Sequence, residues 1–185
     1  MELTTPRLSL RHWRDTDRAP YAALNADGVV MEHFTAPLSP AESDAHVDAI
    51  ETAFAQRGWG LWAAERTDTG AFIGFIGLSV PRFEAPFTPC VEVGWRLARA
   101  HWGLGFAPEG ATAALSFAFD VLRLPDVVSF TTVANARSRR VMDKVGMVHE
   151  PDGDFDHPDV PPGSPICRHV LYRVTPQSQA QTLRR

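Results

Sequence analysis

The chain has 185 residues, enough for one domain with a substantial hydrophobic core. Hydrophobic residues make up 44% of it and charged residues 22%, and 18 basic against 22 acidic residues give a net charge of −4, which argues against a nucleic-acid-binding protein. No apolar run reaches the roughly 18 residues that span a bilayer, and the first residues lack a signal-peptide pattern, so we expect a cytoplasmic protein without membrane contact.

The cysteines and basic residues carry little functional information. Cys90 and Cys167 are too few for a disulfide framework, and their spacing fits no zinc motif. Of the 18 basic residues only Lys144 is a lysine. Because arginine is used throughout, an arginine by itself is no sign of a phosphate site, although the residue type suits one.

The predicted elements alternate between strands and helices. We expect a strand over residues 8–13, a helix over 16–25 and a second helix over 39–56, where Ser39, Pro40 and Glu42 form a capped start. Strands follow over 61–65, 71–80 and 90–98. A helix over 107–122, a strand over 127–133, a helix over 137–145 ending at Gly146 and a strand over 168–174 complete the pattern. This order predicts a mixed α/β domain.

Two segments differ from the rest. In residues 151–165, 11 of 15 are Pro, Gly or Asp, so this stretch suits neither a helix nor a central strand. Its acidic run resembles a calcium loop but has His157 and Gly163 where such a loop needs Gly and Glu, so we expect no metal. After Thr175 the chain is polar without periodicity, which predicts a flexible tail over 175–185 behind a single domain over 1–174.

A strand, a glycine-containing turn and a helix start follow one another between Gly94 and Ala107. Glycines allow close approach of a ligand, and free N–H groups at a helix start favour negative charge, so this stretch predicts a phosphate or pyrophosphate cradle. Pro108 replaces the third glycine of a dinucleotide fingerprint, and the chain has no Gly-Lys-Ser/Thr for a triphosphate loop. An ordinary turn before a helix remains the alternative.

A second stretch of the sequence helps to identify the ligand of the predicted cradle. Asn135 and Ser138 stand in an Asn-x-x-Ser pattern, and Lys144 and Gly146 follow as Lys-x-Gly. Together with the run from Trp102 to Ala107 and the opening run from Pro6 to Arg11, the chain resembles the GCN5-related N-acetyltransferase (GNAT) superfamily, within it the ribosomal-protein-alanine N-acetyltransferase-like (RimJ/RimL-type) branch. The resemblance extends from Thr5 to about Val174. It implies a twisted mixed sheet of about seven strands, splayed at an acetyl-CoA cleft and flanked by about four helices.

The resemblance also implies the acyl donor and the residues that bind it. Acetyl-CoA would lie between the strands 90–98 and 127–133, with the backbone near Leu97 bonding the pantetheine arm like an added strand. The residues expected to bind it, from the strand end, the cradle and the second stretch, are Leu97, Ala98, Trp102, Gly103, Leu104, Gly105, Phe106, Ala107, Asn135 and Ser138. His101 beside the cradle is expected to be a solvated turn residue.

Glu92 and Ser138 are the expected catalytic residues. Glu92 matches the glutamate that contacts the substrate amine in the branch, directly or through water, and burial beside a cleft would raise its pKa toward that of a useful base. Ser138 is a candidate general acid for the leaving thiolate, and a helix cap or coenzyme contact is the alternative. Phe83 and Phe87, with Glu92, are expected at the substrate, where the 82–89 loop and the acidic 152–159 segment would receive a cationic amine. A solvated surface loop is the alternative for the acidic segment.

Three departures from the family pattern affect the donor site. Leu104 replaces a usual Lys or Arg, Pro108 a usual Thr, and Gly110 a usual Ala. None of them removes the backbone donors of the cradle. We therefore predict an acetyl-CoA-dependent N-acetyltransferase that acetylates a primary amine, either a protein N-terminus or a small molecule, without metal or nucleic acid and as a homodimer. The alternative is a catalytically weak acyl-CoA-binding sensor or interaction module.

Overall fold

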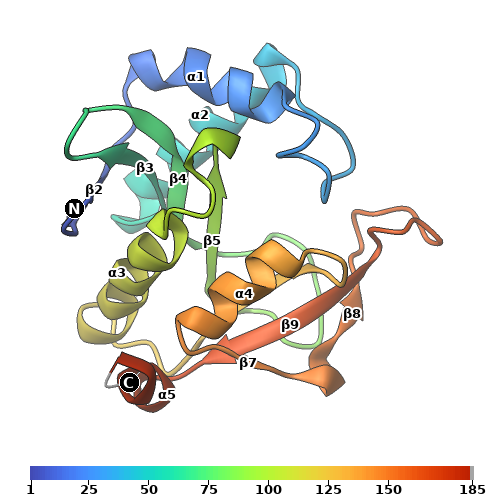
Figure 1. Ribbon diagram of the computed structural model, residues 1–185. Coiled ribbons are helices and arrows are strands. Elements are labelled where there is room, and N and C mark those ends of the chain that lie inside the picture. Colours follow the sequence, from blue (N-terminus) through green and yellow to red (C-terminus); the bar gives the residue numbers. More distant parts are fainter. Residues whose placement is uncertain (184–185) are drawn as a thin grey trace. The chain divides into compact units, whose positions relative to one another are not determined.

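The computed structural model describes residues 1–183, which form a mixed α/β fold (Figure 1). Within these residues nine strands follow the hydrogen-bonded order β1-β2-β3-β4-β5-β6-β9-β7, and β8 pairs with β9. The strands are β1 (Leu3–Thr4), β2 (Leu8–Arg11), β3 (Leu61–Arg66), β4 (Phe72–Ser79), β5 (Glu92–Leu97), β6 (Val127–Thr132), β7 (Val148–His149), β8 (Phe155–Asp156) and β9 (Arg168–Val174). The helices are α1 (Asp15–Ala26), α2 (Pro40–Arg57), α3 (Phe106–Asp120), α4 (Ala136–Lys144) and α5 (Pro176–Leu183), with 3₁₀ turns η1 (Arg99–His101) and η2 (Pro151–Gly153).

The predicted fold class is confirmed, with a larger sheet than expected. The three added strands, β1, β7 and β8, are two residues long each, which is too short for side-chain alternation to reveal. The chain divides into two compact units, Met1–Leu78 with Gly94–Ala114, and Ser79–Val93 with Leu115 onward.

The first unit contains β1 to β4, α1 and α2. Its strands β1 to β4 pair antiparallel, with Leu10 opposite Ala64 in one register. The cap predicted for α2 is confirmed, since Ser39 and Glu42 form a capping box and Gly58 ends the helix at φ 77°. The largest fully buried side chains of this unit come from its strands and helices: Leu8, Leu10, Tyr21, Val47, Trp62, Ile73, Ile76 and Leu78.

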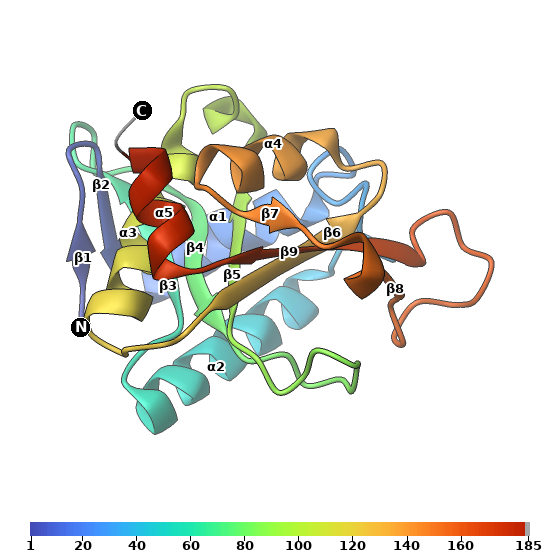
Figure 2. The same cartoon turned by 90° about the horizontal axis from the view of Figure 1, so that it is seen from below.

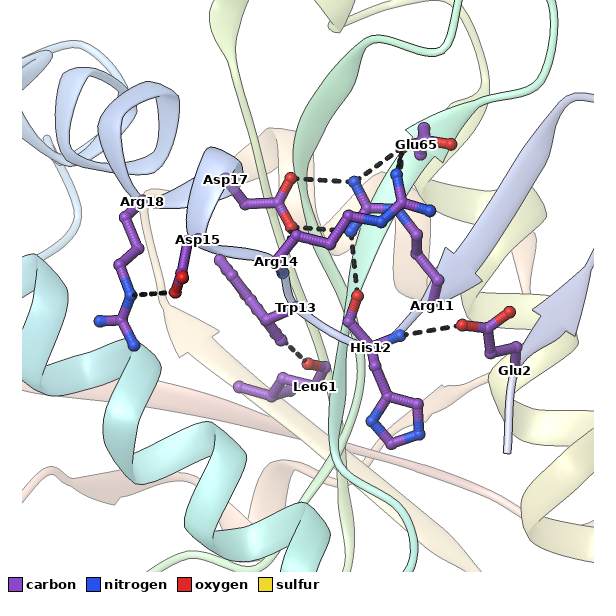
Figure 3. A network of polar contacts seen from close by, with 10 residues as sticks. All are labelled: Glu2, Arg11, His12, Trp13, Arg14, Asp15, Asp17, Arg18, Leu61 and Glu65. Carbon is purple, nitrogen blue, oxygen red and sulfur yellow. Dashed lines mark hydrogen bonds and ion pairs between the residues drawn. The ribbon is translucent and has the colours of Figure 1, made fainter.

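A buried ion cluster ties β2 to α1 and β3 (Figure 3). The Arg11 guanidinium is 3% exposed and lies 2.7 Å from a carboxylate oxygen of Asp17 and 2.7 Å from one of Glu65. These two carboxylates raise the pKa of Arg11 against the lowering effect of burial. Arg11 is therefore a fully compensated buried charge, which is the condition under which such a charge is tolerated.

The second unit holds β6, β9 and α4, with β7 and β8 pairing along β9 (Figure 2). β6 and β9 pair antiparallel over six residues, from Val127 opposite Val174 to Thr132 opposite His169. The start of β5 joins them in the parallel pair of Glu92 with Val128. Helix α4 packs on the face that carries Thr131 and Tyr172, because Asn135 bonds Thr131 and Arg139 donates to the Tyr172 hydroxyl.

Residues 176–183, part of the segment that the sequence predicts to be a flexible tail, form helix α5. Thr175 and Ser178 exchange backbone and side-chain hydrogen bonds at its start, and Gln179 is 6% exposed. Thr182 lies so close to Gly146 that a Cβ there would meet its hydroxyl at 2.6 Å. Capping and packing on Gly146 thus stabilise a segment whose composition lacks helical periodicity. Residues 184 and 185 of the predicted tail lie outside the described residues.

A search of residues 1–183 for a helix long and apolar enough to cross a membrane finds none.

Candidate active site

The predicted cradle in the first unit has the backbone that the sequence requires. After η1, Gly103 and Gly105 take φ values of 75° and 85°, a conformation that favours glycine, and α3 begins at Phe106. A Cβ on Gly103 would meet no atom within 4 Å, and one on Gly105 would meet only the Arg7 guanidinium, at 3.2 Å. The turn is therefore open to a ligand beside the amides of the first helical turn.

Arginine side chains that the sequence does not single out flank this turn. Arg7 Nη1 donates to the Leu104 carbonyl at 2.9 Å, and the Arg7 and Arg66 guanidinium carbons lie 4.8 Å and 5.3 Å from the centre of the Phe106 ring. Glu109 forms an ion pair with Arg7 and offsets part of its charge. Leu104 itself is 51% exposed. Arg66 likewise forms an ion pair with Asp68 at 2.6 Å, so both arginines near the cradle have a carboxylate partner.

The strand end before the cradle is more fully bonded than expected. The Trp102 indole N–H donates to the Leu97 carbonyl at 2.7 Å, and the Ala98 N–H donates to the Ile73 carbonyl at 2.8 Å. The expectation of an unpaired backbone near Leu97 is therefore wrong for these two groups. Trp102 holds the turn against the strand that precedes it.

His101 differs from the solvated turn residue that the sequence predicts. Its Nδ1 is buried and has no hydrogen-bond partner. Burial, and next the nearby Arg66 charge, lower the pKa of His101 from its ordinary value. The imidazole is therefore neutral at physiological pH, which disfavours a charged contact with phosphate.

Glu92 lies at the start of β5, in the second unit. The Ser79 hydroxyl donates to Glu92 Oε2 at 3.1 Å. Burial raises the pKa of the Glu92 carboxyl from its ordinary value to about 7, and the hydrogen bond from Ser79 opposes that rise. A carboxyl with such a pKa accepts and returns protons near neutral pH, which suits a general base.

Unlike the Glu92 carboxyl, the Cys90 thiol does not exchange its proton near neutral pH. Burial, and next the charge of Glu92, raise the pKa of its thiol to about 11. The thiol therefore stays protonated at neutral pH and is a poor nucleophile. A covalent acetyl-cysteine at this position is therefore disfavoured.

Asn135 caps α4, as its position before a helix suggests. Its Oδ1 accepts from the Ser138 N–H at 3.0 Å, and its Nδ2 donates to the Thr131 hydroxyl at 2.9 Å. One N–H of the amide is left for another partner. Ser138 is half-buried in the first turn of the same helix, so both residues lie together at one helix start.

Phe83 and Phe87 form part of an aromatic cluster in the second unit. The two rings lie 6.3 Å apart, and the other members come from β6, β8, β9 and the segment after β8: Phe130, Phe155, His157 and His169. The Phe83 ring lies 5.8 Å from Phe155 and 4.5 Å from His157, so the 82–89 loop contacts the 152–159 segment. The cluster also contains two histidines whose pKa burial lowers.

The register of β6 relates this cluster to Glu92. Val128 is the parallel partner of Glu92, and Phe130 is two residues further along β6. Because side chains alternate along a strand, Val128 and Phe130 point to the same face, which is opposite to that of Thr131. The aromatic cluster therefore begins on the sheet face toward which Glu92 points. Among residues 1–183 no group of three or more His, Cys, Asp and Glu is placed to hold a metal ion.

Known proteins match this chain in sequence and in structure. Residues 7–148 match the family model described as an acetyltransferase (GNAT) domain. The FsC-acetyl coenzyme A-N(2)-transacetylase of Aspergillus fumigatus is 32% identical over 180 residues, 94% of this chain and 75% of the relative. An acetyltransferase structure from Agrobacterium tumefaciens is 27% identical with a TM-score of 0.75 and covers 94% of both chains. The RimL ribosomal L7/L12 alpha-N-protein acetyltransferase, in complex with coenzyme A, is 17% identical with a TM-score of 0.74, covering 95% of this chain and 98% of that one, a likeness of fold alone.

Proposed function

We propose that this chain, which belongs to the acetyltransferase (GNAT) family, moves the acetyl group of acetyl-CoA directly to a primary amine. The observation that carries the proposal is Glu92, a carboxyl whose pKa burial raises to about 7. An ammonium group must lose a proton before its nitrogen can attack a thioester, and a base with a pKa near the working pH removes that proton most effectively.

The donor would be held by backbone groups of the cradle. Acetyl-CoA supplies the activated acyl group. The open turn at Gly103 and Gly105 and the amides of Phe106 and Ala107 suit its pyrophosphate. The guanidinium groups of Arg7 and Arg66, which are paired with Glu109 and Asp68, lie nearby. The free N–H of Asn135 Nδ2 suits a carbonyl of the pantetheine arm. The remaining lone pair of the Leu97 carbonyl, beside the Trp102 bond, suits an amide of the same arm.

The protons would pass through Glu92 and Ser138. Glu92 accepts a proton from the acceptor ammonium, directly or through a water molecule, and Ser79 keeps its carboxyl oriented. The departing thiolate takes a proton from the Ser138 hydroxyl or from solvent. Because a serine hydroxyl is a weak acid, Ser138 contributes chiefly as a coenzyme contact unless its pKa falls on donor binding.

The acceptor would lie at the aromatic cluster that contains Phe83 and Phe87. Electron-rich ring faces attract a cationic amine, and the rings exclude water from the nitrogen. The Aspergillus relative is named for transfer to a nitrogen, N(2), from acetyl coenzyme A, which supports an amine as acceptor. Protein N-termini, as in the RimJ/RimL-type branch, and small amines are the two acceptor classes to compare. A homodimer and a cytoplasmic location stay predictions.

The test begins with calorimetric titration of acetyl-CoA into the parent and into Gly105→Glu. The new side chain would fill the cradle and add a negative charge, so binding should be lost. Gly163→Glu is the matched control, because Gly163 has a nearly equal φ of 83° in an open loop. Acetylation of N-terminal peptides and small amines follows. Binding without turnover would favour the acyl-CoA sensor, and no binding by the parent would contradict both functions.

A further inference from the structure

Arg96 in the first unit is a shielded cation without an anion. Its Nη1 donates to Asn25 Oδ1 at 2.7 Å, and its Nε is buried without a hydrogen-bond partner. No carboxylate among the described residues lies within 4.0 Å of the guanidinium. Arg11, in the same unit, contacts the carboxylates of Asp17 and Glu65 (Figure 3). Arg11 therefore has two counter-ions, whereas Arg96 has none among the described residues.

The surroundings of Arg96 are neutral and largely aromatic. The guanidinium carbon lies 4.2 Å from the centre of the Phe34 ring and 5.5 Å from that of Phe75. On α1 the guanidinium bonds the Asn25 amide and interacts electrostatically with Tyr21, whose hydroxyl bonds His46 at 2.6 Å. The rings of Phe34 and Phe75 stabilise the cation, but neither ring offers an acceptor to its N–H groups.

Such an arrangement is costly for a merely structural residue. A half-buried charge without a counter-ion and a buried donor such as Nε without an acceptor each cost free energy of folding. Burial lowers the pKa of the Arg96 guanidinium, yet an arginine side chain remains charged at neutral pH. The charge and the donor are both satisfied if an anion with two coplanar oxygens binds the guanidinium.

We propose that Arg96 binds the carboxylate of a small molecule. A carboxylate fits better than a phosphate because one guanidinium supplies a single positive charge, and its flat fork matches the planar carboxylate.

Phe34 controls access to this group. It lies in the segment between α1 and α2, and its ring is 43% exposed while it covers the guanidinium. Because the ring packs on the guanidinium, we expect it to move aside when a carboxylate binds. Phe34→Ala should leave the carboxylate site intact and increase its affinity, because no ring has to be displaced.

Thermal unfolding tests the carboxylate site independently of acetyl transfer. Thermal unfolding is followed in sodium succinate, in sodium phosphate and in sodium chloride of equal ionic strength. We expect succinate to raise the melting temperature of the parent and of Arg57→Met, which removes an exposed arginine of α2, but not of Arg96→Met. No rise in the parent, an equal rise in Arg96→Met, or a larger Arg96-dependent rise in phosphate overturns the proposal. If Arg96→Met does not fold, Arg96→Lys keeps the charge without the fork, and its rise should be smaller than that of the parent.

Discussion

Glu92 makes stability and activity depend on pH in a linked way. Its carboxyl has a pKa of about 7 in the folded chain against 4.5 as the ordinary value. Because the folded-state pKa is raised, folding favours the protonated form, and its contribution to stability is fully present below pH 4.5 and is lost as the pH rises to 7. A difference of 2.5 pKa units corresponds to about 3 kcal/mol at 1.36 kcal/mol per unit.

Glu92→Gln removes this titration and keeps the shape of the side chain. At pH 4.5 the variant and the parent should have similar free energies of unfolding, since the parent carboxyl is then protonated when folded. Above pH 7 the variant should be the more stable by about 3 kcal/mol, because the parent must then hold a desolvated charge. Urea unfolding from pH 4.5 to 8.5 measures this difference. Asp120→Asn, which removes an exposed carboxylate at the end of α3, is the control and should add no such slope.

The same variant tests the role of Glu92 as a base. The parent should show kcat/KM rising with pH through an apparent pKa near 7, and Glu92→Gln should lose that limb with a fall of about 10²–10⁴ in kcat/KM. Parallel stability curves for parent and variant would refute the raised pKa. If Glu92→Gln abolished the pH dependence of kcat/KM without the expected stability difference, Glu92 would not account for both effects. The same conclusion would follow if only the stability difference appeared.

Three further predictions address other parts of the molecule. Leu104→Arg should tighten acetyl-CoA binding by about two- to fivefold at low salt, with Leu104→Gln unchanged, as measured by calorimetry; an equal gain in both would exclude a charge effect. Cys90 should react with iodoacetamide about a hundredfold more slowly at pH 7.5 than a thiol of ordinary pKa 9.0, by peptide mass mapping, and Cys90→Ser should remain active; fast labelling with loss of activity would contradict its inert character. Gly77→Ala should destabilise the chain by about 1–3 kcal/mol or more, since its Cβ would lie 2.3 Å from the Gly60 carbonyl oxygen, whereas Gly28→Ala, with no atom within 4 Å, should change stability by less than about 0.5 kcal/mol; urea unfolding that gave equal values would refute the packing argument.

The long elements were predictable because their signals are local. The capping box from Ser39 to Glu42, the glycine stop at Gly58 and the apolar run of β4 each lie within a few residues of the element they define. Helix α5 was not predictable in the same way. Its start is capped by Thr175 and Ser178, but it packs on Gly146, which is remote in sequence.

The candidate site was predictable where a residue type follows from the chemistry of its immediate neighbours. The cradle glycines and Asn135 are of this kind, since a left-handed turn and a helix cap restrict the residue at one position. The bond from Trp102 to Leu97, and the burial of His101, depend on how the turn folds back on the strand. No residue spacing in the sequence predicts that the turn folds back on the strand in this way.

The arginines show the limit of composition most clearly. With 17 arginines and one lysine, the residue type carries no information about function, and the sequence treats Arg7, Arg11 and Arg96 alike. The structure separates them by their partners. Arg11 is neutralised by two carboxylates, Arg7 shares its charge between Glu109 and the cradle, and Arg96 meets only neutral groups among the residues described. Since a buried charge requires compensation, the arginine without a counter-ion is the one whose retention a ligand would explain.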